Sequence, residues 1–228
     1  MIVIKSRKAR VFLRFFIPLI ILPALVAAGE LLFDSSRHII ISLSVAALTL
    51  VLFYTSFEEK NIGSRRLVIA SILTALSVIG RFIPLFKPVT ALTIIAALYL
   101  GPETGFLVGS LSALISNIYF GQGPWTAFQM LAWGLIGFLA GYISKPLLRS
   151  KALLLTYGAL SGLMFSLIMD IWTVLWYSGG FNIKLYTAAV ISAIPHTIMY
   201  ALSNVIFLFF LHKPIGEKLG RIKVKYGL

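Results

Sequence analysis

Long apolar runs separated by charged or Pro/Gly-rich breaks dominate the chain. A hydrocarbon core about 30 Å thick is crossed by roughly 20 helical residues, so each run predicts one membrane-spanning helix. The runs are Phe12 to Phe33, Ile39 to Phe57, Leu67 to Ile83, Val89 to Leu100, Thr104 to Phe120, Trp125 to Ile143, Ala152 to Tyr177 and Tyr186 to Leu211. The pattern therefore predicts an all-α, polytopic membrane helical bundle of about eight transmembrane spans.

A hydrophilic break from Glu58 to Arg66 divides these runs into two groups. It is the longest polar stretch between predicted helices, and it separates an N-terminal two-helix hairpin from six further spans. We expect a transmembrane hairpin at residues 1–57, a cytoplasmic linker at 58–66, a six-helix core at 67–212 and a basic cytoplasmic tail at 213–228. No repeat of fixed period is evident, which argues against a transporter built from two inverted halves.

The segment from Arg81 to Thr90 lies between two short predicted spans. These spans hold about 17 and 12 residues, so neither crosses a bilayer comfortably by itself. Irregular backbone at membrane depth is tolerated only inside protein or beside a wet cavity. The segment is therefore expected to form a loop over an outward-facing pocket. The alternative is a bilayer thinned around two short helices.

Composition makes the bilayer the expected solvent, since 59% of the 228 residues are hydrophobic. The chain has no cysteine, which excludes disulfides, thiolate metal sites and thiol nucleophiles. Of the 20 lysines and arginines, sixteen fall in segments on the side of the N-terminus, and four fall in the opposite segments: Arg37, Arg81, Lys87 and Lys184. The positive-inside rule then predicts a multi-pass protein of the cell (plasma) membrane with both termini in the cytoplasm.

Polar side chains within the spans gather in the outer half of the predicted bundle. Asn117 lies at the outer end of the fifth span, Gln122 lies in the following loop, and Gln129 lies one turn into the sixth span. Asp170 and His196 lie about 10 to 15 Å below the outer ends of the seventh and eighth spans. A carboxylate in hydrocarbon needs a partner or water, so Asp170 is expected to face the bundle interior and to act in binding or gating. The alternatives are a structural pair between Asp170 and His196, and amides that only join helices.

Aromatic residues occupy the same outer side: Tyr119, Phe120, Trp125, Trp133, Trp172, Trp176 and Tyr177. Trp and Tyr populate membrane interfaces regardless of function, and Trp125, Trp176 and Tyr177 fit such a belt. Trp133 and Trp172 lie further in, where a large flat surface suits a heteroaromatic ligand.

Small residues form a further pattern on the third span. There Ala70, Ser71, Thr74 and Ala75 permit the close approach of another helix, either from this chain or from another subunit. Two G-x-x-x-G pairs and one deep amide are expected to serve packing within the bundle: Gly105, Gly109, Gly137, Gly141 and Asn204.

Sequence motifs for ATP hydrolysis and for zinc catalysis are absent. The chain contains neither G-x-x-x-x-G-K-[ST] nor H-E-x-x-H, so any ATP must be hydrolysed by a partner. An intramembrane serine protease, with Ser161 as nucleophile and His196 as base, is an alternative hypothesis. It is disfavoured because Ala159 stands where that motif needs glycine. The two residues are also expected in opposite halves of the membrane, beyond proton-transfer distance.

Several short motifs between Leu67 and Leu211 carry a resemblance to a known family. They are Ile79-Gly80-Arg81-Phe82, Lys87-Pro88-Val89-Thr90, Leu100-Gly101-Pro102, Phe120-Gly121-Gln122-Gly123-Pro124-Trp125 and Gln129-Met130-Leu131-Ala132-Trp133-Gly134. In these motifs the chain resembles the six-helix S components of energy-coupling-factor (ECF) transporters. The last two motifs are similar to the subgroup that includes cobalamin-type S components.

The resemblance implies the substrate-binding S component of an ECF-type ABC importer, with no enzyme activity and no cofactor of its own. Such a subunit captures a vitamin, here cobalamin as the first choice, with riboflavin, pantothenate, folate or a queuosine precursor as alternatives. Its implied partners are a coupling membrane subunit and two ABC-type ATPases, which alone bind ATP, and no nucleic acid. An autonomous secondary transporter is the remaining alternative.

The resemblance also implies which residues form the sites. The expected substrate-binding residues are Arg81, Phe82, Phe86, Lys87, Thr90, Asn117, Tyr119, Gln122, Trp125, Gln129, Trp133, Asp170, Trp172 and His196. The small-residue face for the coupling subunit maps onto Ala70, Ser71, Thr74 and Ala75. No catalytic or metal-binding residue is expected. The N-terminal hairpin departs from the six-helix pattern and receives no predicted role.

Overall fold

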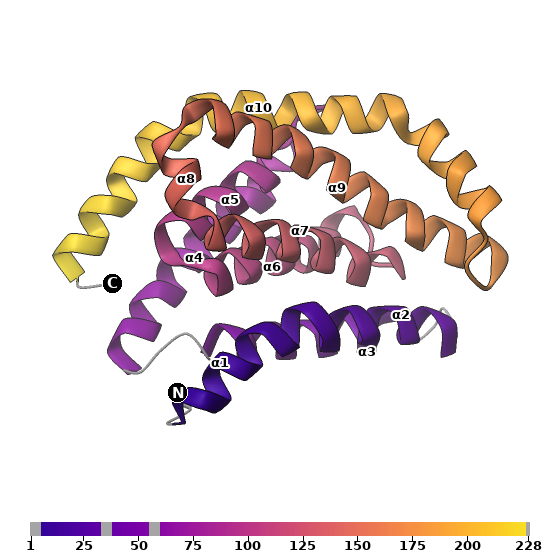
Figure 1. Cartoon of the computed structure of the whole chain (residues 1–228), viewed down its shortest axis with the longest axis horizontal. Helices are drawn as coiled ribbons and strands as arrows, with labels where there is room; N and C mark the ends of the chain where they lie inside the picture. Colours follow the sequence, from indigo (N-terminus) through magenta and orange to yellow (C-terminus); the bar gives the residue numbers. More distant parts are fainter. Residues whose placement is uncertain (1–5, 33–37, 55–59, 227–228) are drawn as a thin grey trace.

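Helices account for nearly all of the residues that the computed structural model describes, which are 6–32, 38–54 and 60–226. No strand occurs within these ranges. The elements are α1 (Arg7–Phe16), the π-helix η1 (Ile17–Ile21), α2 (Leu22–Leu32), α3 (His38–Tyr54), α4 (Lys60–Gly80), α5 (Val89–Leu100), α6 (Pro102–Phe120), α7 (Trp125–Tyr142), α8 (Ser144–Arg149), α9 (Lys151–Ser178) and α10 (Ile183–Tyr226). The prediction of an all-α bundle is confirmed (Figure 1).

The first predicted span is one continuous run of helix that changes character at Pro18. Proline has no N–H group, and its ring crowds the preceding turn, so the local backbone widens into the π-helix η1. The last helix also contains prolines, Pro195 and Pro214, yet it continues to Tyr226. The expected tail from residue 213 is therefore helical wherever the structure describes it.

Two further segments that were expected as loops are helical. α4 begins at Lys60, within the expected linker, and the short α8 follows α7 directly. Both segments contain Lys and Arg, which favour helices. A hydropathy pattern does not reveal them because they carry charge and continue beyond the apolar run.

The bundle has three layers, which are visible in Figure 1. The hairpin of α1 to α3 lies along one side and packs against α6 and α7. α5, α6 and α7 form the middle layer, and α9 and α10 cover the opposite side. On α3, the residues that face the core recur at helical spacing: Ser42, Val45, Ala46, Thr49, Leu52 and Phe53. The hairpin is therefore packed onto the core along its length.

By length and apolar composition, three helical segments of the described chain can cross a bilayer: Lys8–Leu31, Lys151–Ser178 and Ile183–Tyr226. α5 has only 12 residues, and 11 of them are buried. It is thus enclosed by other helices, which explains how such a short helix lies inside a membrane bundle.

Glycines allow α6 and α7 to cross closely. A Cβ atom on Gly105 would lie 2.9 Å from the Gly137 carbonyl oxygen, and one on Gly109 would lie 2.5 Å from the Trp133 carbonyl oxygen. Any side chain at either glycine would push the two helices apart. The predicted packing role of these glycines is confirmed.

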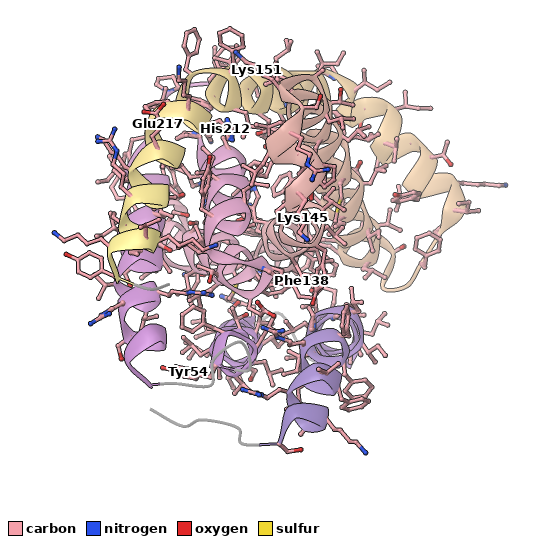
Figure 2. The ribbon with its side chains drawn as sticks, turned by 60° about the vertical axis from the view of Figure 1, so that its left-hand side comes forward. Tyr54, Phe138, Lys145, Lys151, His212 and Glu217 are labelled. Atoms are coloured by element: carbon pink, nitrogen blue, oxygen red, sulfur yellow. The ribbon has the colours of Figure 1, made fainter. Side chains whose placement is uncertain are left out.

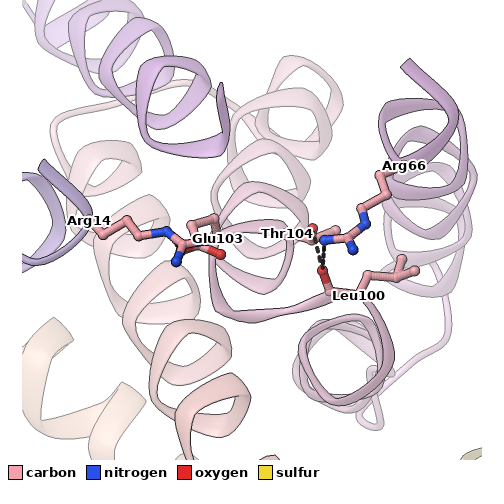
Figure 3. Close-up of polar contacts among 5 residues, drawn as sticks. All are labelled: Arg14, Arg66, Leu100, Glu103 and Thr104. Atoms are coloured by element: carbon pink, nitrogen blue, oxygen red, sulfur yellow. Dashed lines mark hydrogen bonds and ion pairs between the residues drawn. The ribbon is translucent and has the colours of Figure 1, made fainter. Parts of the chain in front are cut away.

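Charged contacts join the elements at the end of the bundle where α5 stops and α6 begins (Figure 3). Arg14 Nε of the hairpin lies 2.7 Å from Glu103 Oε1 on α6, and Glu103 is 2% exposed. Arg66 Nη1 of α4 donates to the Leu100 carbonyl oxygen at 3.1 Å. These contacts hold both α1 and α4 to the turn between α5 and α6.

The final turns of α10 run beside α4, as Figure 2 shows. Arg65 Nη1 donates to the Tyr226 carbonyl oxygen at 2.9 Å, and Gly216 packs on the ring of Tyr99. Leu219 is buried in the core. The C-terminal segment is therefore part of the fold.

Candidate functional site

The opposite end of the bundle carries the connections 81–88, 121–124 and 179–182, and we call it the loop end. The 81–88 loop is tightly held there. Arg81 N donates to the carbonyl oxygens of Ser77 and Val78 on α4. Lys87 N donates to Ser203 Oγ of α10 at 2.8 Å, and that hydroxyl donates back to the Lys87 carbonyl oxygen at 3.1 Å. The loop is thus fixed across the end of the bundle, between α4 and α10.

Arg81 is the centre of a buried polar network. It is 9% exposed, and its Nη1 donates to Ser116 Oγ and, at 2.8 Å, to Asn117 Oδ1 of α6. Asn117 Nδ2 donates in turn to Thr126 Oγ1 and Gln129 Oε1 of α7, both at 2.9 Å. The network therefore joins three helices at the loop end.

Aromatic rings surround the Arg81 guanidinium group. Its central carbon lies 5.0 Å from the ring centroid of Phe120 and 5.3 Å from that of Trp133, within cation–π range. Trp133 Nε1 donates to Thr90 Oγ1 at 3.2 Å. The Trp133 ring also stacks on Phe165 of α9 with centroids 4.8 Å apart. These contacts fix the orientation of both the cation and the indole.

A cavity adjoins this network beneath the 81–88 loop, with about 420 Å³ of space free of atoms, part of it open to solvent. Its walls are Arg81, Lys87, Val89, Thr90, Gln129, Trp133, Gly162, Phe165, Tyr200 and Asn204. We call it the Arg81 cavity. Five of these residues were predicted to bind substrate: Arg81, Lys87, Thr90, Gln129 and Trp133.

The other five wall residues were not predicted as binding residues. Val89, Gly162, Phe165 and Tyr200 belong to apolar helices, in which sequence alone does not show which face turns inward. Asn204 was predicted to serve packing, and its Nδ2 does donate to the Gly158 carbonyl oxygen across the α9–α10 contact at 3.0 Å. Asn204 is a polar residue deep within the eighth predicted span, and that position was the signal that could have placed it in the cavity.

Several other predicted residues lie around the loop end without lining the Arg81 cavity. Phe82 is half exposed and packs against Tyr119, with ring centroids 4.6 Å apart. Phe86 is half-buried in the loop. Gln122 Nε2 donates to the Leu114 carbonyl oxygen at 2.8 Å, so it closes the end of α6. Asn117 supports the cavity indirectly, through Arg81 and Gln129.

The residues predicted on α9 and α10 stand apart from the network. Asp170 is 7% exposed, and its Oδ2 has no hydrogen-bond partner. His196 is exposed, and within the described ranges no ion pair joins it to Asp170. The proposed pairing of these two residues is therefore not formed. Trp172 lies between Trp125 and Trp176, with centroids 5.8 Å and 6.2 Å away, in an aromatic row outside the cavity walls.

The protease hypothesis finds no supporting geometry. Ser161 is buried, and its Oγ donates to the Tyr157 carbonyl oxygen of its own helix at 2.7 Å. In the described part of the chain no contact joins it to the exposed His196. A serine that lacks a base within hydrogen-bond reach is not activated as a nucleophile.

The hairpin forms one wall of a second cavity at the loop end. Glu30 and His38 lie on the hairpin side of this cavity, and Phe128 and Trp176 lie on the core side. It holds about 650 Å³ of space free of atoms, part of it open to solvent. Sequence reasoning missed this cavity because it depends on how the hairpin packs.

The small-residue pattern of α4 divides between two faces. Ala70 is buried and packs within the bundle, so it is not available to a partner. Ser71 and Ala75 are exposed, and Thr74 lies between them at the bottom of an open groove. The groove, with about 570 Å³ of space free of atoms, runs between α4 and α6 and is lined by Ser71, Thr74, Ala75, Val78, Ile79, Leu111 and Ile115.

The electrostatics of the Arg81 cavity are one-sided. Two of its wall residues are cations and none is an acid. Burial, together with the nearby charge of Arg81, lowers the pKa of Lys87. In a membrane-buried site, such uncompensated positive charge favours an anion nearby.

A comparison with known families adds to this geometry. The family model described as "ECF transporter, substrate-specific component" matches residues 65–216, about two thirds of the chain. The chain belongs to this family. As an ECF substrate-specific component it is a membrane-embedded, substrate-binding transport subunit, not an enzyme, and it works with other ECF transporter components. The predicted resemblance is thereby confirmed at the family level. No curated protein and no solved structure matches the chain significantly.

The matched region begins within α4 and ends in the last part of α10. It includes all ten walls of the Arg81 cavity and the whole α4–α6 groove. The hairpin lies outside it. Both candidate surfaces of this ECF component thus belong to the part shared with the family.

Proposed function

We propose that this ECF component captures a vitamin-type small molecule outside the cell, in the Arg81 cavity, and delivers it through an ATP-driven coupling module. The observation that carries the proposal is a buried cation, Arg81, fixed by Ser116 and Asn117 at the wall of a cavity. Ionisable residues within membrane bundles are costly and typically functional. The direct test is a binding screen of the purified full-length chain against vitamins. If none bound, the capture function would be rejected.

The proposed orientation places the loop end outside and both termini in the cytoplasm of a plasma-membrane protein. The distribution of lysines and arginines supports it. The chain contains no cysteine, so single cysteines can report sidedness. In intact cells, a membrane-impermeant maleimide should label Lys184→Cys at the loop end and leave Lys145→Cys unlabelled. The reverse pattern would invert the orientation.

For the substrate, the sequence resemblance suggests cobalamin, whereas the size of the Arg81 cavity supports a smaller molecule. Even with its solvent-open part included, the space free of atoms in this cavity is about 420 Å³, which sets an upper bound on the ligand volume that it encloses as it stands. Riboflavin, pantothenate, folate and a queuosine precursor remain alternatives. Including cobalamin in the binding screen decides between the two size classes.

The proposed partners are a coupling membrane subunit and two ABC-type ATPases, with the α4–α6 groove as the docking surface for the coupling subunit. Exposed Ser71 and Ala75 leave room for a partner helix to approach closely. Ala75→Leu should fill the groove and reduce co-purification of the coupling subunit, with vitamin binding retained. Ala188→Leu on an exposed part of α10 is the matched control. If the same amount of coupling subunit co-purified with both variants, the proposed docking surface would be contradicted.

An autonomous secondary transporter is distinguished by a transport assay. Proteoliposomes that contain only this chain and carry an ion gradient should show no substrate uptake. Addition of the coupling subunit, the ATPases and ATP should produce it. Robust uptake by the chain alone would reject the proposed dependence on a coupling module.

A further inference from the structure

The Arg81 cavity holds positive charge without a counter-charge. Neither Arg81 nor Lys87 forms an ion pair within the described ranges, and no Asp or Glu lines the cavity. Arg81 Nε is buried and has no hydrogen-bond partner. Burying a cation without a counter-ion costs free energy, and the bonds of Arg81 to Ser116 and Asn117 supply acceptors but no opposite charge. A bound anion would supply that charge.

The free hydrogen-bonding groups of the cavity are also donors. Gln129 Oε1 already accepts from Asn117, which leaves the two amide hydrogens of Gln129 for a ligand. Thr90 Oγ1 accepts from Trp133, so its hydroxyl hydrogen is likewise left to donate. Together with the positive charges of Arg81 and Lys87, these groups favour a ligand rich in acceptor oxygens, as carboxylates and phosphates are.

The remaining walls are apolar. Phe165 is buried, stacks on Trp133 and makes an edge contact with Tyr200 at a centroid distance of 5.3 Å. Val89 completes this surface. The cavity thus has a cationic part beside the loop and an aromatic part on α9 and α10, which together match a small molecule with one charged end.

We infer that the substrate captured by this subunit is a small organic anion. Its carboxylate or phosphate lies between Arg81 and Lys87, and its apolar or aromatic part lies against Phe165 and Tyr200. The inference rests on the proposed capture function and narrows it to one chemical class. Lys87 selects for charge in this arrangement, while Arg81 both binds the anion and is itself held in place by α6.

The test uses the purified full-length chain in detergent and pairs of ligands that differ mainly in charge. Suitable pairs are nicotinate with nicotinamide, pantothenate with panthenol, and flavin mononucleotide with riboflavin. Calorimetry should detect binding of at least one acid. Its neutral partner should bind about tenfold more weakly or worse, since a hydrogen bond to a charged group is lost. Cobalamin and thiamine are included as ligands that are not small anions.

Lys87→Gln separates charge recognition from folding. No hydrogen bond of the Lys87 side chain would be lost, because its bonds to Ser203 are made by the backbone. The variant should bind the acid about tenfold more weakly and the neutral partner about equally well. Lys87→Arg should retain most of the affinity for the acid. The matched control Lys184→Gln, an exposed cation of the loop end outside the cavity, should bind both ligands as the parent chain does.

The outcomes separate this inference from the proposed function. If a neutral or cationic vitamin bound as tightly as any acid, or if Lys87→Gln left the affinity for the acid unchanged, the anionic class would be rejected and capture would stand. If none of the acids bound, the inference would also be rejected. Capture itself would then be judged by the wider vitamin screen.

Discussion

Two sets of polar residues differ in how they are joined, although the sequence predicts both in the outer half of the bundle. Arg81, Asn117 and Gln129, from the 81–88 loop, α6 and α7, are joined by hydrogen bonds. Asp170 and His196, from α9 and α10, are joined neither to each other nor to that network within the described chain. Depth along a helix is therefore a poor guide to partnership, and the rotation of each helix about its axis decides which groups meet.

The difference follows from how each pair of helices packs. α6 and α7 cross on glycine, so the groups at their ends come within hydrogen-bond distance. α9 and α10 also pack closely, at Gly162 against Ala201, but this crossing lies away from Asp170 and His196. The exposed side chain of His196 shows that α10 turns that residue away from the core.

Arg81→Leu should have the largest effect on stability and binding, because it removes the central residue of the hydrogen-bonded network. Asn117 Oδ1 and Ser116 would lose a charged donor, and unfolding should become easier by about 2 to 3 kcal/mol. Substrate binding should be lost. Thermal unfolding and calorimetry on the purified chain measure both effects. Retained binding would mean that the network is only structural.

Gly109→Ala should have the next largest effect, because it tests whether close packing of α6 and α7 creates the network. The added methyl group would lie 2.5 Å from the Trp133 carbonyl oxygen and should separate the helices, at about 1 to 3 kcal/mol of stability. Substrate affinity should fall with it. Gly180→Ala is the control, since a Cβ there meets nothing within 4 Å. Equal stability of the two variants would argue against this explanation.

Asp170→Asn should have the smallest effect. Asp170 neither lines the Arg81 cavity nor contacts the network, so substrate affinity should change by less than about twofold. This expectation departs from the sequence-based one, in which Asp170 binds substrate directly. A loss of affinity as large as that of Lys87→Gln would show that α9 takes part in substrate recognition. The two sets of polar residues would then not differ in function.

Much of the fold follows from the sequence, since the apolar runs give most of the helices within a few residues. The exceptions have a common physical cause. α8 and the final turns of α10 carry too much charge for hydropathy to detect, yet Arg65 and Tyr99 hold those turns of α10 against the core. For the cavity, Arg81, Lys87, Thr90 and Gln129 were predicted as walls, whereas the polar Asn204 was assigned to packing. Phe165 and Tyr200 were not predicted, because an aromatic residue in an apolar helix carries no sign of which way it faces.

The ion pair between Arg14 and Glu103 determines how the chain can be shortened. Glu103 begins α6 and is buried, and the cation that neutralises it at 2.7 Å comes from the hairpin. Cutting the chain back to the family-matched region would remove this cation and leave Glu103 with the more weakly placed charge of Arg66. The truncated chain should therefore be less stable than the full chain, and Glu103→Gln should restore part of the loss, since α1 supplies a counter-ion to the domain that follows it.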